Sequence, residues 1–353
     1  TGSADKVVNL ITFYAQEVRE ILAQIGARSI DEIIGRADLL TQVSRGAANL
    51  DDLDLNPMLI SVDGSRSITY DRTKPRNAVP DTLDAEIIKD GHRFFEDGEK
   101  MQLSYAVRNT LRTIGTRASS HIVKKFGMRN ALQPDHLTVK LTGSCGQSLG
   151  AFSVRGLKLE VQGDANDYVG KGLSGGTITV RPLMSSPLKA EENTIIGNTV
   201  LYGATDGFLF ASGRAGERFA VRNSGASVVV EGCGSNGCEY MTGGVAVILG
   251  RIGANFGAGM TGGMAYVYDP DGLAEDFMNL ESILTCAVGH PHWEMQLKGL
   301  IQRHLDETGS RIAERILSNW DRERQNFLQV CPKEMLDRLA HPLSDEVAKV
   351  PAE

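Results

Sequence analysis

The sequence contains no long apolar run and no block of like charges. No apolar stretch approaches the roughly 20 residues that a membrane helix needs, and the start "TGSADKVVNL" lacks the charged-then-apolar pattern of a secretory signal. The formal net charge is −7, without a run of five or more like charges. These absences argue against a membrane or nucleic acid as partner and predict a cytoplasmic protein.

Cysteine is also scarce, and its five copies are odd in number and scattered, as in reduced intracellular proteins: Cys145, Cys233, Cys238, Cys286 and Cys331. A disulfide framework is therefore not expected. Cys233 with Cys238 forms one possible zinc group, and Cys286 with His290, His292 and His304 forms a looser one. Zinc sites usually use tighter pairs such as C-x2-C, so we predict buried thiols, surface histidines and no metal site.

The chain starts at Thr1 without a methionine, so we expect a fragment or a processed product. An N-terminal threonine can act as a nucleophile with its own amine as base, but nothing near it supports that role. The sequence leaves open how such a fragment arose and what its oligomeric state is.

Glycine, with 39 copies, is unevenly spread and divides the chain into regions. Before residue 130 the pattern is mostly helical, with one apolar face over residues 7–25 and a further helix from Asp81 to before Gly91. The boundaries we predict are a helical segment over 1–45, a linker with helices that pack on a solenoid over 46–135, the solenoid over 136–270, and a helical cover over 271–353.

The solenoid is predicted from a repeated corner, in which Ser, Thr or Asn is followed two residues later by Gly. The corners are Ser174 and Gly176, Thr205 and Gly207, Asn223 and Gly225, Thr242 and Gly244, and Thr261 and Gly263. The glycines at 207, 225, 244 and 263 are 18, 19 and 19 residues apart, and a fixed period of this size is typical of a solenoid. The polar residue can hydrogen-bond its own turn and the glycine tolerates a left-handed backbone, so each corner turns the chain sharply.

Four residues after each corner glycine stands an apolar residue that we expect to point inward: Val180, Ala211, Val229, Ile248 and Val267. The alternate positions face outward. They are Thr177, Thr179 and Arg181 in an early turn but Val245, Val247 and Leu249 in a later one. We therefore expect the early turn to be solvated and the later turns to be covered by helices or a partner domain.

One stretch, "GKGLSGG" at 170–176, fits the G-x-G-x-x-G spacing of a dinucleotide-binding loop. That loop works only when a helix follows and offers its N-terminal amides to the pyrophosphate, and "TITV" at 177–180 reads as a strand. We interpret the glycines as part of the repeat, with no cofactor bound. Four charges inside the repeat could line a ligand groove or form salt bridges between turns: Glu217, Arg218, Arg222 and Glu239.

Several long segments occur in the order expected for one known family: "GDANDYVGKGLSGG" (163–176), "NTVLYGATDG" (198–207), "AGERFAVRNSGASVVVEG" (215–232), "GCEYMTGGVAVILG" (237–250) and "NFGAGMTGGMAYVYD" (255–269). They resemble the C-terminal domain of the large chain of glutamate synthases, named for its Gly-x-Gly repeats. Residues 7–40 are similar to the segment that closes the FMN-binding barrel in that family. The resemblance implies a mainly β fold: a right-handed, single-stranded β-helix of about 18–19 residues per turn, flanked by N- and C-terminal α-helices.

The same resemblance implies a role inside an oxidoreductase acting on CH–NH2 groups. The parent enzyme makes L-glutamate from L-glutamine and 2-oxoglutarate, and its β-helix fixes the amidotransferase and synthase domains relative to each other. FMN and a 3Fe-4S cluster are implied for the full-length chain, and FAD and NADPH for its partner, the small chain. The sequence leaves NADPH and ferredoxin open as electron donor, and leaves open whether any residue lines the ammonia tunnel.

None of the catalytic residues of that family can be carried over. Its nucleophile is an N-terminal cysteine, whereas this chain begins with Thr1, and its iron–sulfur cluster uses three closely spaced cysteines, a pattern absent from this sequence. We therefore expect a structural fragment that is inactive alone. The alternative is an independent β-helix protein like the related one in formylmethanofuran dehydrogenase, which the barrel-closing segment argues against.

Overall fold

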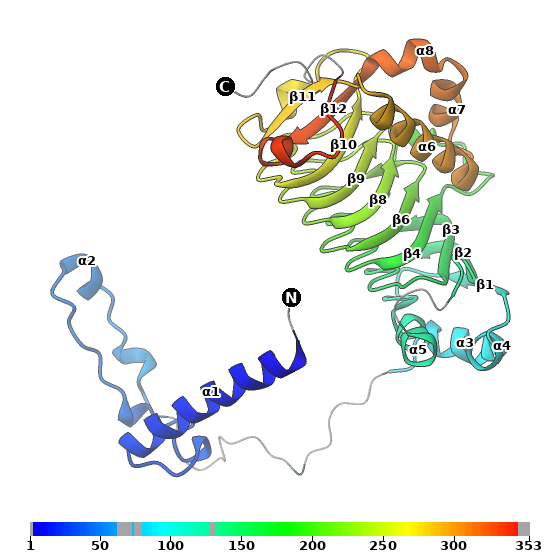
Figure 1. Ribbon diagram of the computed structural model, residues 1–353. Helices are drawn as coiled ribbons and strands as arrows, with labels where there is room; N and C mark the ends of the chain where they lie inside the picture. Colours follow the sequence, from blue (N-terminus) through cyan, green and yellow to red (C-terminus); the bar gives the residue numbers. More distant parts are fainter. Residues whose placement is uncertain (1–2, 62–72, 74–79, 128–131, 345–353) are drawn as a thin grey trace. The chain divides into compact units, whose positions relative to one another are not determined.

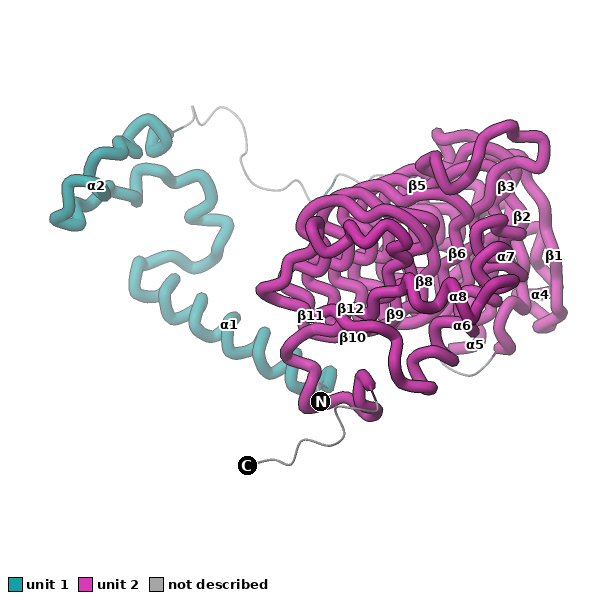
Figure 2. Tube along the Cα trace, turned by 90° about the horizontal axis from the view of Figure 1, so that it is seen from above, with its two compact units in different colours: residues 1–79 teal, residues 80–353 magenta. Residues whose placement is uncertain are grey.

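The computed structural model describes residues 3–61, 73, 80–127 and 132–344 of the 353-residue chain. The chain divides into two compact units, Thr1–Val79 and Pro80–Glu353, which are coloured separately in Figure 2. Figure 1 gives the element labels. Most of the segment at 62–79, which we predicted to be part of a linker, lies outside the described residues. Thr1 lies outside them as well.

The first unit is built around one long helix, α1 (Ala4–Gln24), whose first turn is capped by the Ser3 side chain. Apart from Leu22, its apolar face is not covered by the rest of the first unit, as the exposed fractions of Val7 at 60% and Ile11 at 59% show. The remaining elements of the unit are short: η1 (Ile30–Glu32), η2 (Ala37–Leu39), α2 (Ala48–Asp51) and η3 (Asn56–Met58). An amphipathic helix with an uncovered apolar face needs a further surface to pack against.

The second unit contains most of the secondary structure. Its helices are α3 (Leu83–Asp90), α4 (His92–Asp97), α5 (Thr116–Phe126), η4 (Ala190–Glu192), η5 (Ala274–Phe277), α6 (Pro291–Thr308), α7 (Arg311–Ser318), α8 (Trp320–Glu323), η6 (Arg324–Asn326) and η7 (Lys333–Arg338). The buried carboxylate of Asp84 on α3 accepts hydrogen bonds from the amides of Gly115, Arg117 and Ala118. It thereby satisfies free amides at the start of α5 and joins the two helices.

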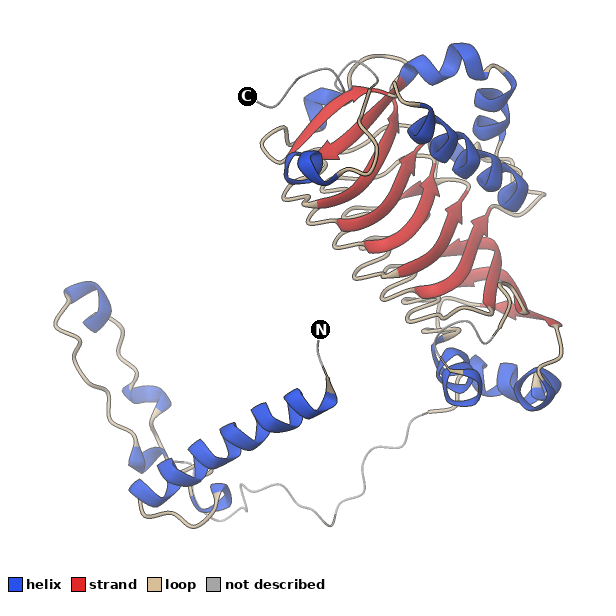
Figure 3. Cartoon of the chain, viewed as in Figure 1, coloured by secondary structure: helices blue, strands red, loops and turns tan. Residues whose placement is uncertain are grey.

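The fold is mainly β, with twelve strands in one mixed sheet (Figure 3). The strands are β1 (Met101–Val107), β2 (Leu137–Cys145), β3 (Leu157–Ala165), β4 (Ser174–Arg181), β5 (Thr194–Ile196), β6 (Asp206–Ala211), β7 (Arg214–Ala215), β8 (Ser224–Val230), β9 (Thr242–Ile248), β10 (Gly262–Tyr268), β11 (Ile283–Ala287) and β12 (Phe327–Pro332). The order is β1-β2-β3-β4-β6-β8-β9-β10-β12-β11, and β5 pairs with β3 and β7. All pairs from β1 to β10 are parallel, whereas β12 is antiparallel to both neighbours.

The segments that return from one parallel strand to the next are also stacked on each other. In each, three alternate residues have positive φ, for example Tyr168, Gly170 and Gly172 at 63°, 66° and 63°. Their amides donate to carbonyl oxygens of the adjacent segments, as Tyr168 does to Asn198 and Gly170 to Leu149, both at 2.8 Å. The pattern recurs at 148–152, 199–203, 218–222, 236–240 and 255–259. The loops are therefore a hydrogen-bonded wall that satisfies its own backbone groups.

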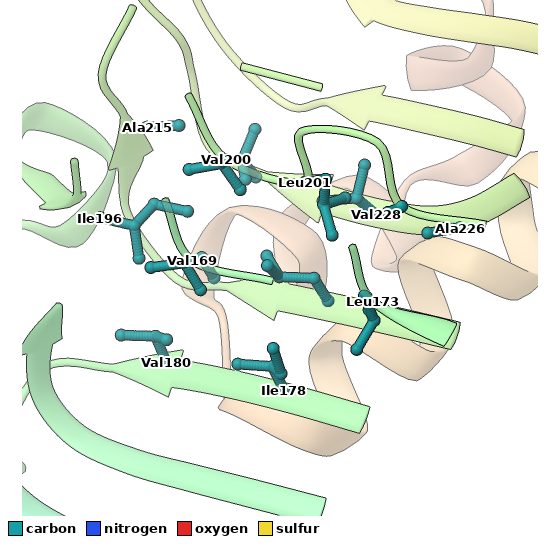
Figure 4. Packing of buried hydrophobic residues seen from close by; sticks show 14 of the residues in the cluster. Val169, Leu173, Ile178, Val180, Ile196, Val200, Leu201, Ala215, Ala226 and Val228 are labelled. Carbon is teal, nitrogen blue, oxygen red and sulfur yellow. The ribbon is translucent and has the colours of Figure 1, made fainter. Parts of the chain in front are cut away.

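Between the strands and this wall lies a continuous apolar interior. Figure 4 shows part of this interior, to which the strands contribute Ile178 and Val228 and the returning segments contribute Val169, Leu173 and Val200; all five are buried in one cluster. Because every turn adds the same kind of layer, the interior extends along the stack.

Four members of the predicted inward column do lie in this interior: Val180, Ala211, Ile248 and Val267. The fifth prediction, Val229, is wrong. Val229 pairs with Phe210 and Val247 and belongs to the outer cluster, while Val230 takes the inward place beside Ala211 and Ile248. The register shifts between Ser224 and Ser227, so this turn holds one more residue after its corner than the glycine spacing suggests.

Helices α6 and α7 cover the outer face of the sheet (Figure 1). Beneath them Val247 and Leu249 are fully buried. The expectation that the early turn is solvated is wrong for Thr177 and Thr179, which are each only 3% exposed, because α6 reaches as far as β4. Among the described helices, none combines the length and apolar character needed to cross a membrane.

Candidate functional site

The glycine-rich stretch at 170–176 is divided between the loop wall and strand β4. Gly170 and Gly172 occupy positive-φ positions of the wall, while Gly175, at φ 123°, follows the start of the strand. Other turns place Leu201, Ala220 or Cys238 where this turn has Gly170. A left-handed non-glycine residue costs about 1–2 kcal/mol, so glycine lowers the strain of this turn.

A pyrophosphate does not fit this stretch, because its backbone donors are already used. The amides of residues 170–174 all donate to carbonyl oxygens of the chain: those of Leu149, Tyr168, Tyr202, Gly170 and Ser153. The element that follows is strand β4, so no helix N-terminus faces the loop. The residues present therefore do not form a dinucleotide cradle.

The corner positions require glycine for different structural reasons. Gly207, Gly244 and Gly263 have φ values of 102°, 81° and 83°, as the predicted left-handed turn requires. Gly176 and Gly225 do not have positive φ. At Gly225 a Cβ would stand 2.0 Å from the carbonyl oxygen of Thr205 in the adjacent turn, so close approach of two backbones demands glycine there.

The polar corner residues also differ. Asn223 is fully buried, accepts from the amide of Ala226 at 3.0 Å and donates to its carbonyl oxygen at 2.9 Å. Ser174 donates to the carbonyl oxygen of Gly172 at 2.9 Å, and Thr205 to that of Leu173 at 3.5 Å. Side-chain hydrogen bonds of Thr242 and Thr261 are absent within the described part of the chain.

The four charges considered for a groove are distributed along the loop wall. Arg218 forms an ion pair with Glu239 of the next turn at 3.2 Å, and Arg222 lies over the ring of Tyr240, 5.8 Å from its centroid. Glu217 contributes its amide, which donates to Asn198 of the preceding turn. The contacts favour links between turns over a ligand groove.

Neither of the two residue groups considered for zinc forms a metal site among the described residues. Cys233 and Cys238 are fully buried, and burial raises the pKa of Cys233 to about 12. The prediction of surface histidines is wrong for His304, which is fully buried on α6, and the prediction of a buried thiol is wrong for Cys286, which is partly exposed. His290 and His292 lie near His341. In the described ranges no three His, Cys, Asp or Glu side chains are arranged to hold a metal ion.

A buried polar cluster under the helical cover was missed by the sequence reasoning. Glu231, directly after β8, is 2% exposed, and its Oε1 accepts hydrogen bonds from Ser212 and from Ser310, the N-cap of α7. Nε2 of the fully buried His304 on α6 lies 3.5 Å from the same oxygen. These four residues span 99 positions of the sequence, from Ser212 to Ser310, so no local motif could reveal them.

A family model described as the GXGXG motif matches residues 84–333. The glutamate synthase [NADPH] large chain of Azospirillum brasilense is 65% identical over 342 residues, covering 97% of this chain and 22% of the relative. The glutamate synthase [NADH] of Schizosaccharomyces pombe is 45% identical, covering 94% and 16%. A ferredoxin-dependent glutamate synthase 2 of a Synechocystis species is 43% identical, covering 94% and 21%.

The match therefore extends over nearly all of this chain but only 16–22% of the relatives' length. The range matched by the family model, 84–333, contains the glycine-rich corners and the loop wall described above. The chain belongs to the GXGXG-motif family and is similar over almost its entire length to a segment of glutamate synthase large chains.

Proposed function

We propose that this chain is the C-terminal region of a glutamate synthase large chain and that it serves as a rigid support for the other domains of that chain. The observation that carries the proposal is the 65% identity over 342 residues to one glutamate synthase large chain. In this proposal residues 1–45 end the FMN-binding synthase domain, 46–135 connect and pack on the repeat, 136–270 form the repeat, and 271–353 cover it. The segment contributes no catalytic residue and is inactive alone.

The repeat region is proposed to be a right-handed, single-stranded β-helix. Support comes from the parallel register of β4, β6, β8, β9 and β10, one strand for each turn, and from the hydrogen-bonded wall of returning segments. Parallel strands joined by a crossover are right-handed in nearly all proteins. A stack with both walls hydrogen-bonded and a continuous apolar interior resists bending, which suits a supporting role.

The apolar face of α1, which the first unit leaves uncovered, supports a larger protein over an independent β-helix protein. Val7, Ile11 and Tyr14 are each more than half exposed, and a surface of this kind needs a covering domain. The proposal assigns that cover to the synthase domain of the same chain.

Cofactors and electron donor belong, in this proposal, to parts of the enzyme beyond these residues. FMN and the 3Fe-4S cluster are assigned to the rest of the large chain, and FAD and NADPH to the small chain. The similar proteins are named for NADPH, NADH and ferredoxin, so similarity over this segment does not select one donor. The five free cysteines are consistent with a reducing compartment such as the cytoplasm.

The test uses a full-length glutamate synthase that carries this region. If the repeat fixes the amidotransferase and synthase domains, loosening it by Gly225→Ala lowers the glutamate formed per glutamine hydrolysed, while each partial reaction persists with its own substrates supplied. Gly299→Ala on α6, where a Cβ meets nothing within 4 Å, is the matched control. Sensitivity of the repeat to protease shows that Gly225→Ala has loosened it. If the glutamate formed per glutamine hydrolysed is nevertheless unchanged, the supporting role is contradicted.

A further inference from the structure

A cavity of about 560 Å³ opens beside the outer face of the sheet, within the second unit. Its walls come from η4, from β7, from the segments that follow β8 and β9, from the end of β10 and the segment after it, and from α7. Small-molecule sites have volumes of about 300–1,000 Å³, so this cavity is large enough for a metabolite. Nothing in the GXGXG motif or in the relatives' names assigns a role to it.

Three arginines from separate elements line the cavity. Arg214 is half-buried on β7, Arg251 follows β9, and Arg315 lies on α7. Within the part of the chain that the structure describes, none of the three guanidinium groups takes part in a hydrogen bond or an ion pair. Guanidinium groups bind carboxylates through paired hydrogen bonds, so the cavity presents unused capacity for an organic anion.

The same cavity is also lined by a buried carboxylate with an unsatisfied oxygen. Glu231 is 2% exposed, and its Oε1 is occupied by Ser212 and Ser310. Oε2 is buried and accepts no hydrogen bond from any described residue. A buried carboxylate oxygen left without a donor is costly, which makes it the natural acceptor for an ammonium group of a ligand.

We propose that this cavity binds a small amino acid with a second carboxylate. Its carboxylates would pair with Arg214, Arg251 and Arg315, and its ammonium group would donate to Oε2 of Glu231. Four further carboxylates line the cavity, those of Glu191, Glu192, Asp269 and Asp271. They repel a multiply charged phosphate more strongly than a ligand whose ammonium group offsets one of its two carboxylates. The site goes beyond the proposed supporting role and does not depend on it.

Isothermal titration calorimetry of the 353-residue chain tests the proposal with L-glutamate, L-aspartate and glutarate, which has two carboxylates but no amine. We expect saturable binding of at least one of the two amino acids. We expect glutarate to bind at least about tenfold more weakly, since a charge-assisted hydrogen bond is lost. In Glu231→Gln this preference for the amino acid over glutarate should disappear.

Replacing the arginines gives a second, independent test of the site. Arg315 is exposed and Arg214 is half-buried, so their replacement does not disturb the hydrophobic core. The double variant Arg214→Gln, Arg315→Gln should weaken amino-acid binding by about tenfold or more. Arg322→Gln, at a side chain 88% exposed on α8, is the matched control and should leave the affinity unchanged. Circular dichroism reports whether each variant is folded. Absence of saturable binding by both amino acids at millimolar concentration, or equal affinity in the double variant and the control, overturns the proposal.

Discussion

The backbone of Gly225 lies against the carbonyl oxygen of Thr205 in the adjacent turn, so closely that a Cβ would stand 2.0 Å from that oxygen. The contact is between two backbones, so no side-chain rotation can relieve it. Gly262 stands in the same relation to Thr242, at 2.1 Å. Glycine at these corners is therefore required by the stacking distance of the turns as well as by chain reversal.

Gly225→Ala should lower the free energy of unfolding by about 3 kcal/mol, because the turn must move away from its neighbour. Gly299→Ala should change it by less, or stabilise the chain by up to about 1 kcal/mol, because alanine favours helix and meets open space. Urea denaturation of both variants measures the difference. Equal stability of the two variants is incompatible with backbone close approach as the reason for the glycine.

Two substitutions on α6, one on its buried face and one on its exposed face, test how this helix is held on the sheet. Leu297 is fully buried in the outer cluster, whereas Met295, two residues away, is 71% exposed. Leu297→Ala should cost about 2–5 kcal/mol of unfolding free energy, since it leaves a cavity under the helix. Met295→Ala should stay within about 0.5 kcal/mol of wild type. A comparable loss in both variants would show that α6 is not fixed by this face.

Thiol labelling should separate one cysteine from the other four. Burial raises the pKa of Cys145 and Cys233 to about 12 and of Cys331 to about 11, and it raises that of Cys238 as well. Because the thiolate is the reactive form, these four should react with iodoacetamide only after unfolding. Burial raises the pKa of Cys286 as well, but this side chain is partly exposed, so it should react first, and faster as the pH rises. Peptide mass spectrometry locates the label, and early labelling of Cys233 argues against its burial.

The segment that contains His341 and Pro342 packs against the start of α6, and we expect it to detach from α6 more often in mild acid. Burial, and then the neighbouring His341 and His290, lower the pKa of His292 below its ordinary value of 6.5. The unfolded segment therefore takes up a proton at a higher pH than the folded one, so stability is full above pH 6.5 and falls as the pH drops from there towards the lowered pKa.

The hydrogen bond from Trp293 Nε1 to the carbonyl oxygen of Pro342, at 2.9 Å, reports this opening through exchange of the indole proton. Exchange should accelerate below pH 6.5 relative to its intrinsic rate, and His292→Gln should flatten the dependence. The same acid dependence in His292→Gln would rule out this histidine as the cause.

Much of the repeat could be predicted because each turn places the same residue types in the same environment. The spacing of Gly207, Gly244 and Gly263 predicted stacked parallel strands, and Val180 and Ile248 were placed correctly. Val229 was misplaced because the extra residue at the bulge near Ser224 leaves no trace in the glycine spacing. A shift of one residue exchanges the two faces of a strand.

Features that depend on distant parts of the chain were not predictable. The burial of Thr177 and Thr179 follows from how far α6 extends over the sheet, which their own polarity does not indicate. Strand β12 is short, lies between helices and pairs antiparallel, so it shares no period with the repeat. The cavity joins Arg214, Glu231 and Arg315, which are far apart in sequence.

The glycine-rich repeats build a stack of turns, and "GKGLSGG" at 170–176 belongs to one of these turns. The most direct test is titration of the 353-residue chain with NAD, FAD and FMN, followed by calorimetry. Because the amides of residues 170–174 are all engaged within the chain, none of the three should bind saturably. Saturable binding at micromolar concentration that is lost in Gly172→Val would contradict the claim.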